Sequence, residues 1–227
     1  MMLIGISGVA GSGKSTAGDF ITEAFDAIAI GQADPMKVIA AMVFGFTDHQ
    51  LYGPSEARNA EDLRYPRPDA VRFDWCKVDH QHGPECGDPI YLTPRHALQA
   101  LGTWGRDCYV DVWAKAAVRR AERLLLDGHD VVTGRTHSRK PSIVMITDVR
   151  YPNELSTIRS AGGRVIRVLR PGSGLAGAAG DHSSEQAMRD VPDAAFDAVV
   201  HNDASISDFR TRVLDAVTAL SWSQDAA

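Results

Sequence analysis

Short apolar runs alternate along this chain with longer stretches in which apolar residues recur at helical spacing. Five runs are expected as buried strands: residues 2–7, 27–30, 142–147, 164–169 and 196–200. Helices are expected at residues 16–25, 35–43, 93–101, 109–126, 149–161 and 205–220, and a further short strand at 130–133. Because strands that alternate with helices form a mostly parallel sheet covered on both faces, we predict a three-layer α/β/α fold.

The first expected strand leads directly into a glycine-rich loop. Residues 8–15 read Gly-Val-Ala-Gly-Ser-Gly-Lys-Ser and fit the P-loop pattern G-x-x-x-x-G-K-[ST] at every position. Glycines let the backbone curl until its N–H groups point at phosphate oxygens, and the N-terminus of the next helix adds positive potential. Lys14 would reach the β- and γ-phosphates of a nucleoside triphosphate, and the Ser15 hydroxyl would bind Mg²⁺. We therefore expect phosphate binding by Gly11, Ser12, Gly13, Lys14, Ser15 and Thr16.

Charged residues stand where two other expected strands end. Asp148 follows the apolar run 142–147, and an acid in that place downstream of a P-loop is expected to hold Mg²⁺. Asp34 and Lys37 lie where the second strand passes into a helix, the edge at which open α/β sheets bind ligands. Spacing alone favours a simpler interpretation of this pair, in which Asp34 caps the helix and Lys37 is solvated.

Two stretches depart from the alternating pattern. Residues 47–93 are rich in Gly, Pro, His and charged residues, and we interpret them as an insertion into the domain. Cys76, His80, His82 and Cys86 could bind zinc, but their spacing matches no common zinc module and favours a polar surface excursion. Residues 171–184 are glycine-rich, which predicts a flexible, lid-like loop over a site, with a plain linker as the alternative.

Composition and charge restrict the possible partners. The length of 227 residues fits one α/β domain over 1–227, and the net charge of −5 argues against nucleic acid. From Arg135 to Arg170, eight Lys and Arg outnumber two acids, which suits a small polyanionic substrate or a solvated basic face. Three cysteines make no disulfide framework, no signal peptide is evident, and no apolar run is long enough to cross a membrane. We therefore expect a cytoplasmic protein without a membrane partner.

Several motifs considered together resemble the phage-type deoxynucleoside monophosphate (dNMP) kinases. The resemblance spans nearly the whole chain and includes the P-loop, residues 33–37, residues 51–56, Arg95-x₃-Gln99-x-Leu101-Gly102-Thr103-x₂-Arg106, the Asp-Val-Arg-Tyr-Pro-Asn-Glu run 148–154 and residues 181–185. It implies a nucleoside monophosphate kinase-like fold and transfer of the ATP γ-phosphoryl group to a dNMP with Mg²⁺. It also implies a homodimer, and the host cytoplasm as the compartment of a phage protein.

The resemblance also implies roles for individual residues. Lys14, Asp148, Arg150 and Arg170 would be catalytic, Ser15 and Asp148 would hold Mg²⁺, and Asn202 would approach the donor adenine. The acceptor would be bound on the side of the 47–93 insertion, by Asp34, Lys37, Arg95, Gln99, Gly102, Thr103, Arg106, Trp113, Arg150 and Glu154. For Trp113, packing on the apolar stripe of its helix is the simpler interpretation.

Two other functions stay open at this point. One is a P-loop kinase of another small acceptor, such as dephospho-coenzyme A, whose family also has an Asn-Asp pair after the last strand, as Asn202-Asp203 stands here. The 148–154 and 98–103 runs argue against it. The other is a nucleotide-dependent switch, which needs loops that sense the γ-phosphate. The number of arginines that could bind phosphate favours two phosphorylated substrates over a switch.

Overall fold

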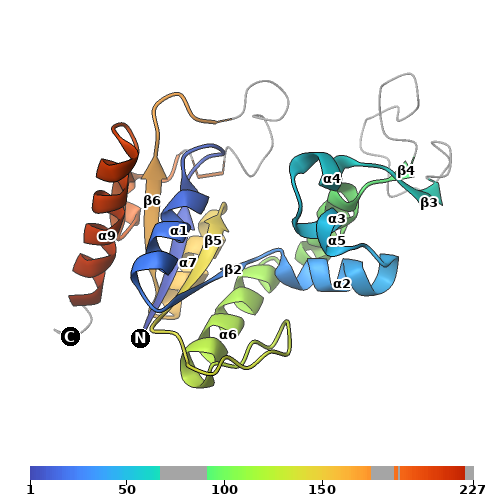
Figure 1. Ribbon diagram of the computed structural model, residues 1–227, viewed down its shortest axis with the longest axis horizontal. Coiled ribbons are helices and arrows are strands. Elements are labelled where there is room, and N and C mark those ends of the chain that lie inside the picture. The colour runs from blue at the N-terminus through green and yellow to red at the C-terminus, as the bar shows by residue number, and fades with distance from the viewer. Residues whose placement is uncertain (67–90, 175–186, 189, 223–227) are drawn as a thin grey trace. The chain divides into compact units, whose positions relative to one another are not determined.

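The computed structural model describes residues 1–66, 91–174, 187–188 and 190–222, and these form two compact units (Figure 1). The first unit consists of Met1–Gln32 with Tyr109–Ala227, and the second is Ala33–Cys108. The predicted insertion 47–93 falls inside the second unit.

The first unit is built on a five-stranded sheet in the order β2-β5-β1-β6-β7, and every neighbouring pair is parallel. The strands are β1 (Met2–Ser7), β2 (Ala27–Gly31), β5 (Ile143–Val149), β6 (Arg164–Leu169) and β7 (Ala198–His201). The five predicted runs are therefore confirmed as strands. Because all strands run the same way, the residues that follow them gather at one edge of the sheet.

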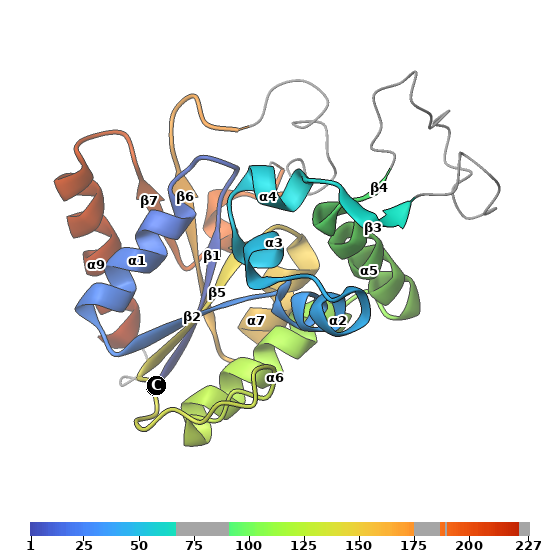
Figure 2. The same ribbon diagram turned by 45° about the vertical axis from the view of Figure 1, so that its right-hand side comes forward.

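Helices cover both faces of this sheet. Helices α1 (Lys14–Ala24) and α9 (Ile206–Trp222) lie together on one side (Figure 2), where Phe20 and Phe209 pack against Ile4 and Ile6. Helices α6 (Val112–Asp127) and α7 (Pro152–Ser160) cover the other side, where Leu3 and Val144 belong to their core. Adjacent residues Leu3 and Ile4 thus face opposite layers, as the twofold period of a strand requires. The predicted three-layer α/β/α fold is confirmed.

The predicted strand at 130–133 is wrong, because these residues form a turn. The Asp130 carboxylate accepts hydrogen bonds from the backbone N–H groups of Val132 (3.0 Å) and Thr133 (3.4 Å), and Gly134 N–H donates to the Asp130 carbonyl (2.8 Å). Such local bonds compete with strand pairing. The turn is fastened to α6 by a buried, bidentate pair from the Arg120 guanidinium to Asp130, with both bonds at 2.8 Å.

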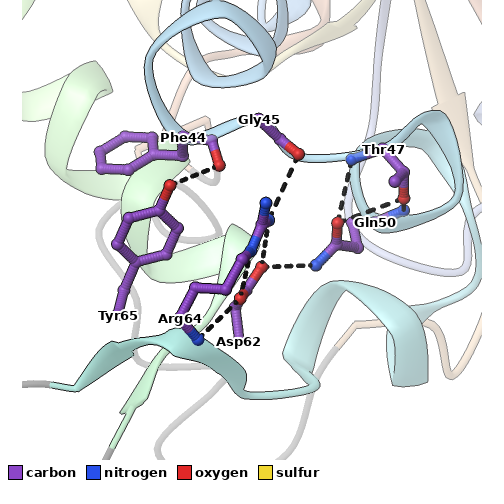
Figure 3. A network of polar contacts seen from close by, with 7 residues as sticks. All are labelled: Phe44, Gly45, Thr47, Gln50, Asp62, Arg64 and Tyr65. Atoms are coloured by element: carbon purple, nitrogen blue, oxygen red, sulfur yellow. Dashed lines mark hydrogen bonds and ion pairs between the residues drawn. The ribbon is translucent and has the colours of Figure 1, made fainter.

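The second unit contains α2 (Asp34–Phe44), α3 (Asp48–Tyr52), α4 (Ser55–Asn59), β3 (Asp62–Pro66), β4 (Tyr91–Leu92) and α5 (Pro94–Cys108). Its small core holds Ala40, Phe46, Leu51 and Ala97. Thr47 and Gln50 form a capping box that starts α3, and the Gln50 amide also donates to Asp62 (3.0 Å) (Figure 3). Arg64 donates to both oxygens of Asp62 (2.8 and 2.6 Å), and these bonds hold the pKa of that carboxyl below its usual range. This network ties β3 to α3.

The predicted end of a helix at Gly102 is also wrong, because α5 continues to Cys108. Gly102 is buried, and a Cβ placed there would lie 3.4 Å from the Met36 sulfur of α2. Gly102 therefore allows a close approach of two helices and does not act as a terminator. The longer helix changes which side chains share a face.

Parts of two predictions lie outside the described residues. Cys76, His80, His82 and Cys86 fall there, as does the predicted lid from residue 175 onward. Within the described ranges, none of the helices combines the length and the apolar character that crossing a membrane would need.

Candidate active site

The P-loop connects β1 to α1 at the edge where the strands end. Gly8, Gly11 and Gly13 have φ angles of +149°, +76° and +106°, a range that L-residues rarely adopt. A Cβ at Gly8 would lie 2.5 Å from the Val168 carbonyl oxygen, and one at Gly13 would lie 2.6 Å from the Asn202 amide nitrogen. Both ends of the loop therefore require glycine for space as well as for conformation.

The Lys14 side chain folds back into the P-loop. Its ammonium donates to the carbonyls of Gly8 (2.7 Å) and Val9 (3.0 Å), and it lies 3.6 Å from Asp148 Oδ1. The side chain is only 13% exposed. The positive charge is therefore held where the loop curls, the place at which this motif binds phosphate.

Asp148 does not simply end a strand. It lies inside β5 as a β-bulge, because Ile6 pairs with Thr147 whereas Ser7 pairs with Val149. Among the described residues, Asp148 is the non-glycine residue with a positive φ, at +70°. Bulges redirect side chains at sheet edges, and such backbone strain gathers at functional sites. The extra residue turns the Asp148 carboxylate towards Lys14.

Arg150 and Glu154 complete this cluster. Arg150 donates to Asp148 Oδ2 through Nε (2.7 Å) and Nη2 (2.6 Å). Glu154 Oε2 accepts hydrogen bonds from the backbone N–H groups of Arg150 (2.7 Å) and Tyr151 (3.1 Å). Burial raises the pKa of the Glu154 carboxyl and the charge of Asp148 adds to the rise, while these N–H groups and the Gln32 side chain oppose it. Sequence reasoning missed Gln32, although a polar residue directly after β2 was a signal.

The other predicted residues of this unit lie in the P-loop, in α1 and α6, or directly after β6 and β7. Asn202, after β7, donates its amide N–H to the Ser12 carbonyl (2.9 Å) and so holds the P-loop backbone in place. Arg170 follows β6 at the same sheet edge and is exposed, while its carbonyl accepts from Ser173. Ser15 and Thr16 start α1, and Trp113 lies half-buried in α6.

Several basic residues of the stretch 135–170 make structural contacts within the first unit. The residues 135–140 precede the amino end of β5, opposite the P-loop edge. Arg159 and Arg164 pair with the buried Asp197 (3.8 and 3.2 Å), and Arg167 donates to the carbonyls of Met188 and Val191. Only Arg150 and Arg170 of the eight lie at the carboxyl ends of the strands, so the local excess of charge is not itself a phosphate site.

In the second unit, the continuation of α5 places the predicted acceptor residues on one helical face. Arg95, Gln99, Gly102 and Arg106 follow at intervals of four, three and four residues, and Thr103 lies beside them. Arg106 donates to the Thr103 hydroxyl (3.4 Å). We call Arg95, Gln99, Gly102, Thr103 and Arg106 the α5 polar face.

Arg58 is a residue that sequence reasoning missed. Its Nη2 donates to the Ser55 hydroxyl (3.3 Å), and Arg95 Nη2 of the α5 polar face reaches the same oxygen (3.5 Å). Arg58 Nε is buried and has no hydrogen-bond partner among the described residues. Two guanidinium groups that meet at one hydroxyl form a candidate anion site. The signal was the three-residue spacing of Ser55 and Arg58, which places both on one side of a helix.

Asp34 and Lys37 are paired at the start of α2. Their charged atoms lie 3.6 Å apart, and the Lys37 ammonium lies 4.0 Å from the centre of the Tyr52 ring. Lys37 is only 19% exposed, and Asp34 does not form the helix cap, which is Ala33. The simpler interpretation of a capping acid beside a solvated lysine is therefore wrong.

The residues of the first unit can be examined for their ability to bind a divalent ion such as Mg²⁺. Groups of three or more His, Cys, Asp or Glu that could hold a metal are absent from the described part of the chain. Asp148 Oδ1 is buried, accepts no hydrogen bond from the described residues and faces the Lys14 ammonium at 3.6 Å, so its lone pairs suit a bound cation. Hard cations such as Mg²⁺ are bound in nucleotide sites by one or two protein oxygens plus phosphates. Ser15 and Asp148 fit that sparse set.

Comparisons with known proteins identify the family of this chain. The family model described as "Deoxynucleotide monophosphate kinase" matches residues 92–213, more than half of the chain. A protein of Acanthamoeba polyphaga mimivirus that carries the name of the same kinase is 28% identical over 220 residues, covering 96% of both chains. The crystal structure of TT1252 from Thermus thermophilus aligns over 96% of both chains with 16% identity and a TM-score of 0.40. The chain belongs to the deoxynucleotide monophosphate kinase family, whose members are ATP-dependent phosphotransferases.

Proposed function

We propose that this chain moves the γ-phosphoryl group of ATP to a dNMP by using the P-loop for the donor and the α5 polar face for the acceptor phosphate. The observation that carries the donor half is the Lys14 ammonium, held inside the P-loop 3.6 Å from Asp148. Phosphoryl transfer depends mainly on positioning and on neutralising charge. The Lys14 ammonium, fixed inside the P-loop, would both position the triphosphate and neutralise part of its charge.

At the donor, the P-loop N–H groups and Lys14 bind the phosphates of ATP. Gly11, Ser12, Gly13, Lys14, Ser15 and Thr16 form this set, with Asn202 fixing the loop through the Ser12 carbonyl. Ser15 and Asp148 would hold Mg²⁺, which when bound neutralises part of the phosphate charge. Arg150 and Arg170, at the same sheet edge, are proposed to contact the migrating phosphoryl group.

At the acceptor, Arg95 and Arg106 of the α5 polar face bind the phosphate of the dNMP. Arg58 joins them, because it shares the Ser55 hydroxyl with Arg95 and has a buried Nε that an anion oxygen would satisfy. Guanidinium groups suit this task since they hold phosphate oxygens in pairs. Asp34, Lys37 and Gln99 are proposed as further acceptor contacts.

The test is a panel of acceptors. The purified chain is incubated with ATP and Mg²⁺ and with each dNMP, each ribonucleoside monophosphate or dephospho-coenzyme A, and ADP and phosphorylated products are separated by chromatography. The proposal predicts that ADP and a dNDP form together, in equal amounts, with at least one dNMP. ADP that forms only with dephospho-coenzyme A, or at the same rate without any acceptor, would support one of the rival functions.

The homodimer implied by the family resemblance is part of the proposal and has its own measurement. Light scattering on the purified chain should give twice the mass of 24.5 kDa. A mass of one chain at assay concentration would remove the dimer and leave the proposed reaction intact.

A further inference from the structure

The Glu154 carboxylate is hydrogen-bonded to the protein itself, unlike a side chain that is available to bind a substrate. Its Oε2 accepts two backbone hydrogen bonds, from Arg150 (2.7 Å) and Tyr151 (3.1 Å), and the residue is half-buried. The Gln32 side chain lies beside the carboxyl. A carboxylate oxygen that already accepts two N–H groups is engaged in a strong local interaction with the protein. Glu154 therefore acts first on the backbone next to it.

The two N–H groups belong to the turn that leads out of the Asp148 bulge. The Arg150 side chain returns from this turn and donates twice to Asp148 Oδ2, leaving Oδ1 to face Lys14. Asp148 keeps a φ of +70°, a conformation that persists where the surroundings over-determine it. The backbone of residues 150 and 151 is one such constraint on Asp148. Its position fixes where the Arg150 side chain begins, and that side chain holds Asp148 Oδ2.

We propose that Glu154 is a positioning residue that sets the Asp148 carboxylate against Lys14 by clamping the backbone N–H groups of Arg150 and Tyr151. This assignment replaces the contact with the acceptor that the family resemblance implies for Glu154. Its consequence for catalysis rests on the proposed function, but the clamp itself does not.

The clamp is tested first without any activity measurement. Amide hydrogen exchange at Arg150 and Tyr151 is compared in the wild type, Glu154→Gln and Glu154→Ala. Gln keeps an oxygen that can accept both bonds, so it should preserve slow exchange, whereas Ala should speed exchange at both amides. Glu122→Ala, at an exposed position of α6, is the matched control and should leave both amides unchanged.

Steady-state kinetics then separate positioning from substrate contact. A misplaced carboxylate should lower kcat about 100-fold in Glu154→Ala, while the KM for dNMP changes less than about twofold. Glu154→Gln should keep kcat within about threefold, because the clamp survives. If Glu154 contacts the acceptor instead, both variants raise the KM for dNMP and the exchange of the two amides stays slow.

These measurements distinguish the two proposals. A wild-type chain that transfers no phosphoryl group to any dNMP contradicts the proposed function, and amide exchange still decides on Glu154. An active wild type whose Glu154→Ala variant keeps both slow exchange and full kcat contradicts the clamp. If Glu154→Ala does not fold, Glu154→Asp takes its place in both experiments, because it is one methylene too short to reach both N–H groups.

Discussion

Lys14 Nζ and Asp148 Oδ1 lie 3.6 Å apart, although one belongs to the P-loop and the other to a strand 134 positions along the chain. The parallel pairing of β1 with β5 brings the two residues to one sheet edge, and the bulge at Asp148 turns its carboxylate towards the ammonium. The cationic donor site and the acid proposed to hold Mg²⁺ are therefore parts of one arrangement.

Asp148→Gly should separate stability from activity. Glycine adopts a φ of +70° without strain, which stabilises the fold by about 1 kcal/mol, whereas the half-exposed pair of Asp148 with Arg150 contributes about 0–1 kcal/mol. The less exposed Lys14 ammonium keeps its hydrogen bonds to the Gly8 and Val9 carbonyls. Thermal unfolding should therefore show no fall in Tm, while kcat with ATP and dNMP falls about 100-fold or more. A variant with full kcat would show that the carboxylate has no part in transfer.

Gly13→Ala should damage the P-loop more than Gly11→Ala. Both positions have positive φ, but an Ala Cβ at Gly13 would lie 2.6 Å from Asn202 and 3.2 Å from Phe209, whereas at Gly11 it would meet nothing within 4 Å. Strain alone costs about 1 kcal/mol at each site, and the contact adds to it at Gly13. Tm and the affinity for ATP, measured by calorimetry, should both fall further in Gly13→Ala. Equal losses in the two variants would contradict this account of the loop.

Arg58→Gln and Arg95→Gln should weaken the acceptor site selectively. Each removes one of the two guanidinium groups that meet at Ser55, so the KM for dNMP should rise about tenfold or more while the KM for ATP stays unchanged. Arg123→Gln, which removes an exposed arginine of the first unit, is the control. A rise in the KM for ATP instead would assign these arginines to the donor.

Asp130→Asn should cost the first unit about 3–5 kcal/mol, since it leaves the buried Arg120 guanidinium without its counter-charge. Although burial by itself raises the pKa of Asp130, the bonds from Arg120 and from the turn outweigh it and lower that pKa below the ordinary value. A carboxyl with a depressed folded-state pKa stabilises fully above about pH 4, and this contribution is lost as the pH falls through the folded-state pKa.

Chemical denaturation between pH 7 and pH 2 measures both effects at Asp130. The wild type should lose stability as the pH falls below about 4, and Asp130→Asn should lack that part of the pH dependence. Asp127→Asn is the matched control, because its pair with Arg123 is half-exposed and contributes about 0–1 kcal/mol. Similar losses in the two variants would show that the buried pair has no special role.

The sheet, its helices and the P-loop could be predicted because their signals are local. A run such as Ile143–Ile146 is apolar throughout, and the P-loop pattern specifies a strand, a loop and a helix together. The bulge at Asp148 could not be found in this way, since a strand buried on both faces lacks the alternation that would show an added residue.

Other features depended on contacts between distant residues. Because glycine is common at helix ends, Gly102 suggested the end of a helix. Its close packing against Met36 explains instead why a glycine lies inside α5. The turn at Asp130 depends on Arg120 of another element, and the site shared by Arg58 and Arg95 joins two helices. The phage origin, the homodimer and the zinc alternative stay predictions.

The most direct test of the proposed transfer is the rate of dNDP formation by Lys14→Ala at saturating ATP, Mg²⁺ and dNMP. The ammonium inside the P-loop is proposed to neutralise the phosphate charge during transfer, so kcat should fall about 1,000-fold while circular dichroism stays that of the wild type. A folded Lys14→Ala chain that makes dNDP at the wild-type rate would contradict the account.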